Sequence, residues 1–328
     1  ACARCHDHLS EPIGAEDYYA FAGIFASVQH DYVTRGDHTL HIVSDAVLKN
    51  LRVFRNGDPE QAGELAPRRN IRLLSPHPDL DAYQDGSGRR ELAAELTAPS
   101  NPLLARVMVN RVWGELFGRY LVETPSNFGQ SGAPPTHPEL LDYLACRFVE
   151  NGWSVKWLVR ELVSSATYRQ ERVQAGTPGL PLYAGMMRRR LTAEMIRDSM
   201  LFASRELSLD PPTQSLPASH LDNRNRTIYA RFSRLERDGF LDEFDYPDPA
   251  LHTPRRDSSI TATQKLFLLN NDFVNQRAEK LAKGKKWVNP DHGVTALYRQ
   301  LFARPPSDEE RRIALRFLAA GGGTDRAW

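Results

Sequence analysis

Apolar residues recur at three- and four-residue intervals along most of the chain, which is the spacing of one face of an α-helix. The first segment with this spacing runs from Glu16 to Val28, and a second covers residues 89 to 97. The longest is PLLARVMVNRVWGELFG, from Pro102 to Gly118. We expect Ser100 to cap this third helix and Gly118 to end it, because serine bonds free amide groups and glycine adopts the left-handed conformation of a helix end.

Start and stop signals predict further helices along the chain. In THPELLDYLACRFVENG, Thr136 stands at the capping position and Glu139 closes a capping box, while Pro138 lies in the first turn and Gly152 ends the segment. Comparable start signals stand at Ser154, at Thr261 with Gln264, and at Ser307 with Glu310.

Signals for β-structure are few. The segment LRVFRNGDP, from Leu51 to Pro59, predicts a short strand that ends in a turn. From there to Gly88 proline, glycine and charged residues predominate, so we expect a linker or an irregular surface segment. RNRTIYARF, residues 224 to 232, is compatible with a strand or a short helix. The fold class predicted is mainly α, with at most a small β element.

Composition narrows the class of protein. The chain has 328 residues, of which 41% are hydrophobic and 25% charged, as in a soluble globular protein. Its formal net charge is +1, so no overall field points to nucleic acid or to an anionic membrane. No apolar stretch reaches the roughly 18 to 20 residues that span a bilayer. We therefore expect a protein that is not transmembrane over this length and has no nucleic-acid partner.

The chemically most specific motif stands at the amino end, where Cys2, Cys5 and His6 spell C-x-x-C-H. This is the attachment sequence of c-type haem. Two thiols at this spacing add to the two vinyl groups of the porphyrin, and the adjacent imidazole binds the iron as its axial ligand. The motif predicts covalent haem c held by Cys2 and Cys5, with His6 as the metal ligand.

Three other interpretations of the motif remain open. A thioredoxin-type redox pair would need the motif between a strand and a helix of a βαβ unit. A zinc site would need further ligands, of which His8 is the nearest. A plain disulfide between Cys2 and Cys5 would form in an oxidising compartment.

A sixth iron ligand is expected from a histidine, unless that position stays open. Met108 lies on the apolar face of a predicted helix, so we expect it in the core rather than on iron. The histidines nearer to the motif are His30, His38, His41 and His77. Cys146, which lies mid-helix beside Ala145, is expected to be a buried small apolar residue.

An ordered series of segments makes the chain recognisable: CARCHDH, PI, DYY, NPLLARVMVNRVWGELFGRYLVETPSNFG, PPTHPELLDYLACRFVENGWSVKWLVREL, SSATYRQ, RRRLTAEMIRD, FDYPDP and TQKLFLLNNDFV. With these segments the chain resembles the large planctomycete cytochrome-type multidomain proteins, in which a haem-motif domain of unknown function precedes a second, helical domain of unknown function. One departure is the sequence Leu9, Ser10, Glu11, where the family usually has a lysine and an aromatic residue.

The resemblance implies how the chain is organised and where it acts. Residues 1–30 would be the tail of the c-type haem-motif domain, residues 31–88 a linker and short strand region, and residues 89–328 the helical domain. It also implies a piece of a longer protein, a periplasmic, secreted or cell-surface setting, and an upstream cytochrome module or a redox partner protein. Several family members are associated with polysaccharide breakdown.

The polar signatures of the second domain have two interpretations. They fall on Asn110, Arg111, Asn127, His137, Arg190, Glu194, Arg197, Asp198, Arg255, Arg256, Thr261, Gln264 and Asn270. One interpretation is a network of buried ion pairs and helix caps. The other is a cleft for an anionic ligand, which would be lined by Asn110, Arg111, Asn127, His137, Arg190, Arg197, Arg255 and Arg256.

The sequence thus favours an extracytoplasmic c-type haem protein that transfers electrons or provides a scaffold for a redox partner. The alternative is a module that binds or degrades acidic or sulfated polysaccharide, with haem peripheral or absent. No Ser-His-Asp order, paired-carboxylate signature or phosphate-binding loop accompanies the polar residues, so catalytic residues stay unassigned.

Overall fold

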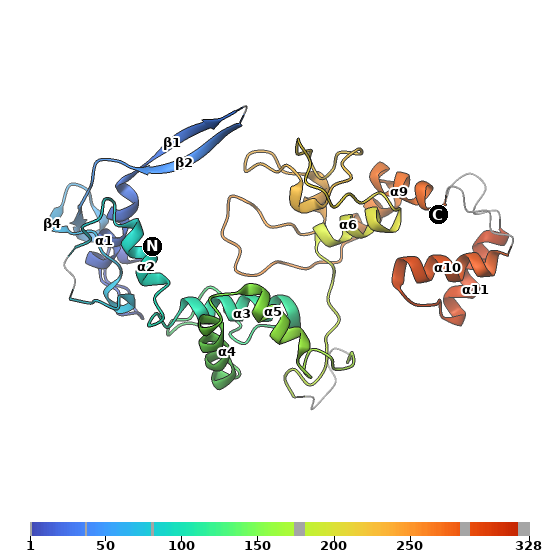
Figure 1. Cartoon of the computed structure of the whole chain (residues 1–328), viewed down its shortest axis with the longest axis horizontal. Coiled ribbons are helices and arrows are strands. Elements are labelled where there is room, and N and C mark those ends of the chain that lie inside the picture. The colour runs from blue at the N-terminus through green and yellow to red at the C-terminus, as the bar shows by residue number, and fades with distance from the viewer. Residues whose placement is uncertain (1, 37, 80–81, 174–180, 283–288, 321–328) are drawn as a thin grey trace. The chain divides into compact units, whose positions relative to one another are not determined.

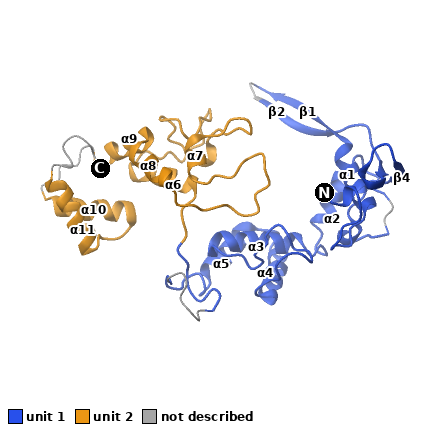
Figure 2. Ribbon diagram, turned by 180° about the vertical axis from the view of Figure 1, so that it is seen from behind, with its two compact units in different colours: residues 1–188 blue, residues 189–328 orange. Residues whose placement is uncertain are grey.

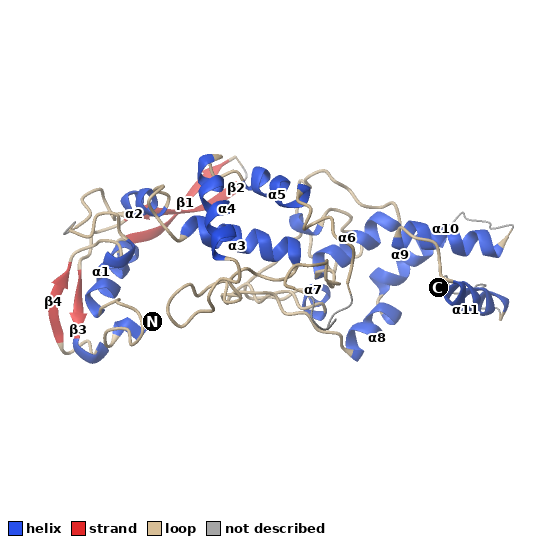
Figure 3. Cartoon of the chain, turned by 90° about the horizontal axis from the view of Figure 1, so that it is seen from below, coloured by secondary structure: helices blue, strands red, loops and turns tan. Residues whose placement is uncertain are grey.

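The computed structural model describes residues 2–320 except 37, 80–81, 174–180 and 283–288, and it also leaves out the side chain of His38. The chain forms two compact units, residues 1–188 and 189–328 (Figure 2). In the described residues, eleven α-helices accompany two antiparallel sheets of two strands each (Figure 3). The predicted mainly α fold is confirmed. None of the described helices combines the length and the apolar character needed to cross a membrane.

The first part of unit 1 surrounds helix α1, Ala15–Ala26, which the apolar spacing predicted. A 3₁₀ turn, Cys2–Arg4, precedes α1, and the hairpin β1 (Val28–Arg35) and β2 (His38–Asp45) follows it (Figure 1). The second hairpin pairs β3 (Leu51–Phe54) with β4 (Ala62–Ala66), and α2 covers Arg89–Leu96. The strand at Leu51 and the helix at residues 89–97 were predicted. The β1–β2 hairpin was missed, because both of its faces are largely exposed and no burial pattern marks it.

Residues 59–88, expected to be a linker or an irregular surface segment, include strand β4, and several of their side chains are buried. Ala66, Arg69, Asn70 and Tyr83 are buried in unit 1. The Arg69 guanidinium pairs with Glu16 at 2.9 Å and with Asp17 at 2.5 Å, both in the first turn of α1. These ion pairs hold the pKa of the Glu16 carboxyl below its usual value, against the effect of burial. The charged residues of this segment therefore form ion pairs inside the unit. Local composition alone does not distinguish such paired residues from charged residues exposed to solvent.

The base of the β1–β2 hairpin is held by Asp45, the last residue of β2. Its carboxylate accepts hydrogen bonds from the Ser87 hydroxyl at 2.7 Å and the Ser87 amide at 3.0 Å, and Arg89 pairs with it at 2.7 Å. Mainly the Ser87 hydrogen bonds, and then Arg89, lower the pKa of Asp45 to about 2. The interaction anchors the hairpin to the start of α2.

This anchor should weaken in acid. Because the pKa in the folded chain is below the ordinary 3.8, the stabilising effect is complete above pH 3.8 and is lost as the pH falls toward about 2. We expect amide protection at the base of β2 and at Ser87 to fall across that interval. Hydrogen exchange followed by NMR checks this, with Asp45→Asn as the control. Equal pH dependence in both proteins would contradict the assignment to Asp45.

The rest of unit 1 is a packed set of three helices, α3 (Leu104–Phe117), α4 (Pro138–Glu150) and α5 (Val155–Ser164). Their apolar faces form one core that includes Val109, Trp113, Leu144, Phe148 and Leu158, with the Trp113 and Phe117 rings stacked at 4.1 Å. Met108 packs against this core, as predicted.

Three local predictions about these helices need correction. Ser100 does not cap α3: the Asn101 side chain accepts the Leu103 and Leu104 amides, at 3.0 and 3.1 Å. Thr136 does not cap α4 either, because its amide and hydroxyl both bond the Leu121 carbonyl and the helix begins after His137. Cys146 is exposed rather than buried, since it lies on the outward face of α4. The predicted ends at Gly118 and Gly152 are confirmed, both at positive φ.

Unit 2 contains α6 (Ala193–Ala203), α7 (Gly239–Glu243), α8 (Ala262–Asn270), α9 (Asp272–Ala282), α10 (Pro290–Phe302) and α11 (Asp308–Ala319). Leu201, Phe240, Phe244 and Phe273 form its core. The predicted capping boxes at Thr261 and Ser307 are present. Within RNRTIYARF, residues Thr227–Tyr229 form a short 3₁₀ turn.

Candidate functional site

The C-x-x-C-H motif forms a single exposed turn at the start of unit 1. The Cys5 amide donates to the Cys2 carbonyl at 3.1 Å, which closes the turn. Cys2 and Cys5 both carry free thiols, and Cys2, Cys5 and His6 are all exposed. All three side chains therefore belong to one local structure that solvent reaches.

Contacts with α1 hold this turn in place. The Tyr19 hydroxyl, from the buried side of α1, donates to the Arg4 carbonyl at 2.9 Å. The Asp7 carboxylate accepts the amide of Ala15, the first residue of α1, at 2.8 Å. A carboxylate at a helix start is favoured by the free amides and by the helix dipole. Sequence reasoning missed Tyr19 and Asp7 as positioning residues, because Asp7 lies eight positions before the amide that it accepts.

The hydrogen bonding of His6 defines which ring nitrogen is available. Its Nδ1 lies 2.7 Å from the Asp7 carbonyl oxygen. A carbonyl oxygen only accepts, so Nδ1 carries the hydrogen and the neutral ring presents a lone pair at Nε2. A metal-binding imidazole commonly donates its other nitrogen to a backbone carbonyl in this way. The contact with Asp7 thus favours the tautomer that an iron ligand needs.

The surroundings of the thiols bear on whether a thioether-bound porphyrin fits here. Gly57, at the β3–β4 turn with φ +75, approaches Cys5 so closely that a Cβ there would lie 2.5 Å from Cys5 Sγ. Beneath the turn, Tyr19 packs against Phe54 with ring centroids 5.4 Å apart. Leu9, three residues after His6, is 93% exposed. Two free thiols, an imidazole whose Nδ1 is occupied by a carbonyl, and nearby apolar side chains are the donor set that the group needs.

The geometry gives less support to a zinc site or a thioredoxin-type redox pair than to the haem interpretation. His8 is engaged at Nδ1 by the Glu11 amide, at 3.1 Å. Across the described residues, no group of three or more His, Cys, Asp and Glu side chains is placed to hold a metal ion. Both sheets found there are antiparallel, whereas a thioredoxin-type site belongs to a βαβ unit.

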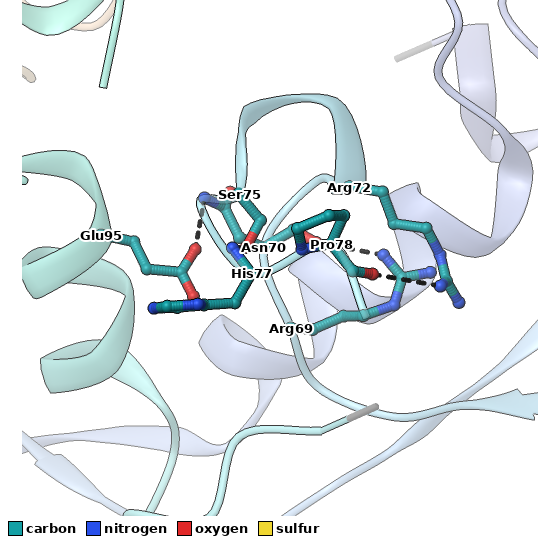
Figure 4. A pocket seen from close by; sticks show the side chains of 7 residues that line it. All are labelled: Arg69, Asn70, Arg72, Ser75, His77, Pro78 and Glu95. Carbon is teal, nitrogen blue, oxygen red and sulfur yellow. Dashed lines mark hydrogen bonds between the residues drawn. The ribbon is translucent and has the colours of Figure 1, made fainter. Parts of the chain in front are cut away.

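The expected sixth-ligand histidines occupy different parts of unit 1. His30 and His41 are exposed on the β1–β2 hairpin, where the His41 ring packs edge-on against Tyr32 at 4.8 Å. The His38 side chain lies outside the described residues. His77 lines a small polar pocket together with Arg69, Asn70, Arg72, Ser75, Pro78 and Glu95 (Figure 4). The choice of a sixth ligand stays a prediction.

The pocket in Figure 4 is small and its charges are paired. The space it outlines, open solvent included, is about 170 Å³, so it is not a cavity that could take a larger organic ligand. Glu95, which is buried, accepts the Asn70 amide group at 3.0 Å, and Arg72 pairs with Glu16 at 3.2 Å. Its polar groups therefore mainly join residues 69–78 to α1 and α2.

Four residues expected in an anion cleft lie in unit 1. Asn110 is fully buried on α3, and its side-chain amide bonds both the carbonyl and the amide of Val122, at 3.0 and 2.8 Å. Asn127 lies in an exposed loop, where its side chain bonds Gly129 and Ser131. His137 precedes α4 with its ring against Tyr183, and Arg111 is exposed on α3.

The other four lie in unit 2. Arg197 is fully buried on α6 and donates to the carbonyls of residues 218, 223 and 225 and to the Thr227 hydroxyl. Arg256 pairs with Glu194 at 2.7 Å, Arg190 donates to Gln264 at 2.7 Å, and Arg255 is exposed. These contacts favour the network interpretation for Asn110, Arg197 and Arg256, and the anion cleft stays a prediction.

A polar cluster around Asp245, in the FDYPDP segment, was not singled out from the sequence. Asp245 adopts φ 59, which is uncommon for a non-glycine residue. Its carboxylate accepts the Ser259 amide and hydroxyl, each at 2.7 Å, and Gln264 donates to the same hydroxyl at 3.3 Å. Burial opposes the charge, but the Ser259 hydrogen bonds keep the pKa of Asp245 below its usual value. The sequence signal available for this cluster was the order Asp-Tyr-Pro-Asp, because an aspartate shortly before a proline indicates a turn.

Two family models match the chain. PSD1, a protein of unknown function (DUF1553), matches residues 88–318, and PSCyt2, a protein of unknown function (DUF1549), matches residues 1–30. The first match runs through both structural units. No curated protein and no solved structure matches the chain. The resemblance to a planctomycete-type pair of domains is thereby confirmed at the level of the two domains.

Proposed function

The chain belongs to the PSD1 family of proteins of unknown function, and from its amino-terminal turn we propose that it binds haem c and serves in electron transfer. The single observation that carries the proposal is the geometry of residues 2–6. Two free, exposed thiols share one turn with an imidazole whose Nδ1 donates to a carbonyl and whose Nε2 is left to bind iron. Bound haem would supply reversible one-electron chemistry at iron.

The roles of the residues follow from their contacts. Cys2 and Cys5 anchor the porphyrin, and His6 binds its iron. Asp7 orients His6 through its backbone carbonyl and ties the turn to α1 through its carboxylate. Tyr19 holds the turn from below by its hydrogen bond to Arg4. An imidazole held in one orientation by a second hydrogen bond would suit electron transfer at a bound haem.

The test is covalent haem attachment in a host with cytochrome c maturation. We expect a pyridine haemochrome spectrum and a mass increase of one haem for the wild type. Cys2→Ser with Cys5→Ser should abolish attachment, because no thiol remains to form a thioether. Cys146→Ser, which removes the exposed thiol of α4, is the matched control and should keep the haem.

His6→Ala separates ligation from attachment. It should retain some thioether-bound haem but lose the low-spin absorption of an iron with histidine bound on its proximal side. A wild-type protein without covalent haem in that host would refute the proposal. A mass two hydrogens below the thiol form would instead identify a Cys2–Cys5 disulfide.

The second function considered from the sequence, binding or degradation of acidic or sulfated polysaccharide, stays a hypothesis. It is based on the many arginine residues of the chain and on the association of several family members with polysaccharide breakdown. The arginines expected to serve it are in part engaged inside unit 2, as Arg197 and Arg256 are. We therefore place the haem proposal first.

A further inference from the structure

The β1–β2 hairpin projects from the α1 part of unit 1 as a two-stranded ribbon (Figure 1). Tyr32, Leu40, Ile42 and Val43 on this ribbon are all exposed, with Tyr32 60% accessible. Within the described residues no third strand pairs with it. Isolated two-stranded hairpins are marginal in water, and exposed strand edges favour pairing with another strand. The hairpin is thus a candidate interaction surface.

The hydrogen-bond alternation shows which residues face outward. The Ala46 amide donates to the Ser27 carbonyl at 2.8 Å, next to the first strand pair. Since bonded and non-bonded pairs alternate in an antiparallel ladder, odd-numbered residues of β1 bond β2, whereas His30, Tyr32 and Thr34 direct their amides and carbonyls outward. The Tyr32 amide accordingly bonds the Asp31 carboxylate, at 2.8 Å.

The two edges of the ribbon differ. On the β2 edge, the Arg89 guanidinium donates to the outward carbonyl of Val43 at 3.3 Å and also pairs with Asp45. On the β1 edge, the contact at Tyr32 comes from the neighbouring Asp31 side chain, which can turn away. Among the described residues, only the β2 edge is bonded by a side chain from outside the hairpin, so the β1 edge is available for strand pairing from His30 to Thr34.

We propose that β1 pairs antiparallel with β1 of a second copy of this chain, about a two-fold axis through Val33. In this register Tyr32 of one copy bonds Thr34 of the other, so outward amides meet outward carbonyls. Asp31 then stands opposite Arg35 of the second copy, twice per dimer. Opposite charges placed directly across two strands stabilise the pair.

Charge excludes the neighbouring registers. An axis through Asp31 would place the two Asp31 carboxylates opposite each other, and an axis through Arg35 would do the same for two guanidinium groups. An axis through Tyr32 would leave Asp31 opposite Val33, without an ion pair. Opposite charges therefore meet only when the axis passes through Val33.

The same register joins the apolar side chains. Val33 lies opposite Leu40 and Asp31 opposite Ile42 in the hairpin, so Val33, Leu40 and Ile42 share one face. Pairing two ribbons at Val33 gives a four-stranded sheet with one continuous apolar band on that face. Sheets of three or more strands with an apolar face are stable where a single hairpin is not.

A charge swap tests the register in the full chain by sedimentation and light scattering. We expect the wild type to show twice the 37.1 kDa mass of one chain as its concentration rises. Asp31→Arg alone, or Arg35→Asp alone, should weaken the dimer at least about tenfold, because like charges then face each other. The double variant carrying both changes should restore it. Failure of the double variant to recover would overturn the register.

Two proline variants test the edge. Thr34 and Thr39 are cross-strand partners whose amides both point away from the hairpin ladder, so proline at either leaves the hairpin bonds intact. Thr34→Pro should abolish the dimer because it removes an amide of the β1 edge, and Thr39→Pro, on the β2 edge, should not. The proposal is overturned if the chain stays monomeric up to about 0.5 mM, where weak edge pairing would be visible, or if Thr34→Pro dimerises like the wild type.

Discussion

Replacing Arg197 by methionine is expected to lower the free energy of unfolding of unit 2 by about 3–5 kcal/mol, the usual effect of breaking a buried charged network. Arg197 is fully buried, and burial lowers its pKa to about 10, so it stays charged at neutral pH. Its guanidinium satisfies three backbone carbonyls and the Thr227 hydroxyl, which itself donates to Asp198 at 2.6 Å. Methionine keeps the volume but leaves these acceptors buried without donors.

The measurement must report on unit 2 alone, because the two units need not unfold together. Hydrogen exchange of the amides between residues 218 and 227 does so. Protection there should fall markedly in Arg197→Met, whereas amides of α3 in unit 1 should not change. Arg312→Met, at an exposed position on α11, is the matched control and should lie within about 0.5 kcal/mol of the wild type. A loss below about 1 kcal/mol for Arg197→Met would show that the network is dispensable.

Replacing Asn110 by leucine should destabilise unit 1 by about 2–4 kcal/mol. The side chains have similar size, so packing changes little, but the buried amide and carbonyl of Val122 both lose their partner. Each unsatisfied buried backbone group costs about 1–3 kcal/mol. The loop that leads from α3 to α4 would then lose its attachment to α3 at Val122.

Urea unfolding followed by tryptophan fluorescence measures this effect, because Trp113 lies one helical turn from Asn110 in the core of α3–α5. Asn127→Ala is the control, since Asn127 bonds its neighbours in an exposed loop and should cost less than about 1 kcal/mol. Equal midpoints for both variants would mean that the Val122 contacts do not stabilise the unit.

These two residues explain why the polar signature of the helical domain is ambiguous in sequence. Asn110 and Arg197 both stand on apolar helix faces, where a polar residue indicates either a ligand site or an internal bond. In the structure both bond backbone groups of a later irregular segment, Val122 in one case and residues 218, 223 and 225 in the other. The shared role is to hold an irregular segment against a helix.

The haem and dimer proposals can fail separately. Haem attachment depends on residues 2–6 and on Asp7 and Tyr19, whereas strand pairing depends on residues 30–35. A colourless protein that still dimerises would remove only the electron-transfer proposal. A haem-bearing monomer would remove only the pairing of β1 with a second copy.

The sequence by itself determined what depends on neighbours along the chain. The apolar spacing located α1, α2 and α3, the start and stop signals located α4, and the capping boxes at Thr261 and Ser307 are as local patterns predict. The C-x-x-C-H turn is local as well, closed by a bond between residues three apart. A helix or a turn is formed by contacts within four residues, so its signal is present in any short window.

Only the tertiary structure decided which partners distant residues find. Thr136 was expected to cap a helix but bonds Leu121, and Arg69, in an expected surface segment, is buried against α1. The Asp7 carboxylate bonds the first residue of α1, eight positions later in the sequence. Arg89 bonds the outward carbonyl of Val43 on β2, and this contact distinguishes the β2 edge of the hairpin from the β1 edge. Whether a polar side chain is solvated, paired or left to bind something depends on groups far away in sequence, and chain folding alone brings those groups together.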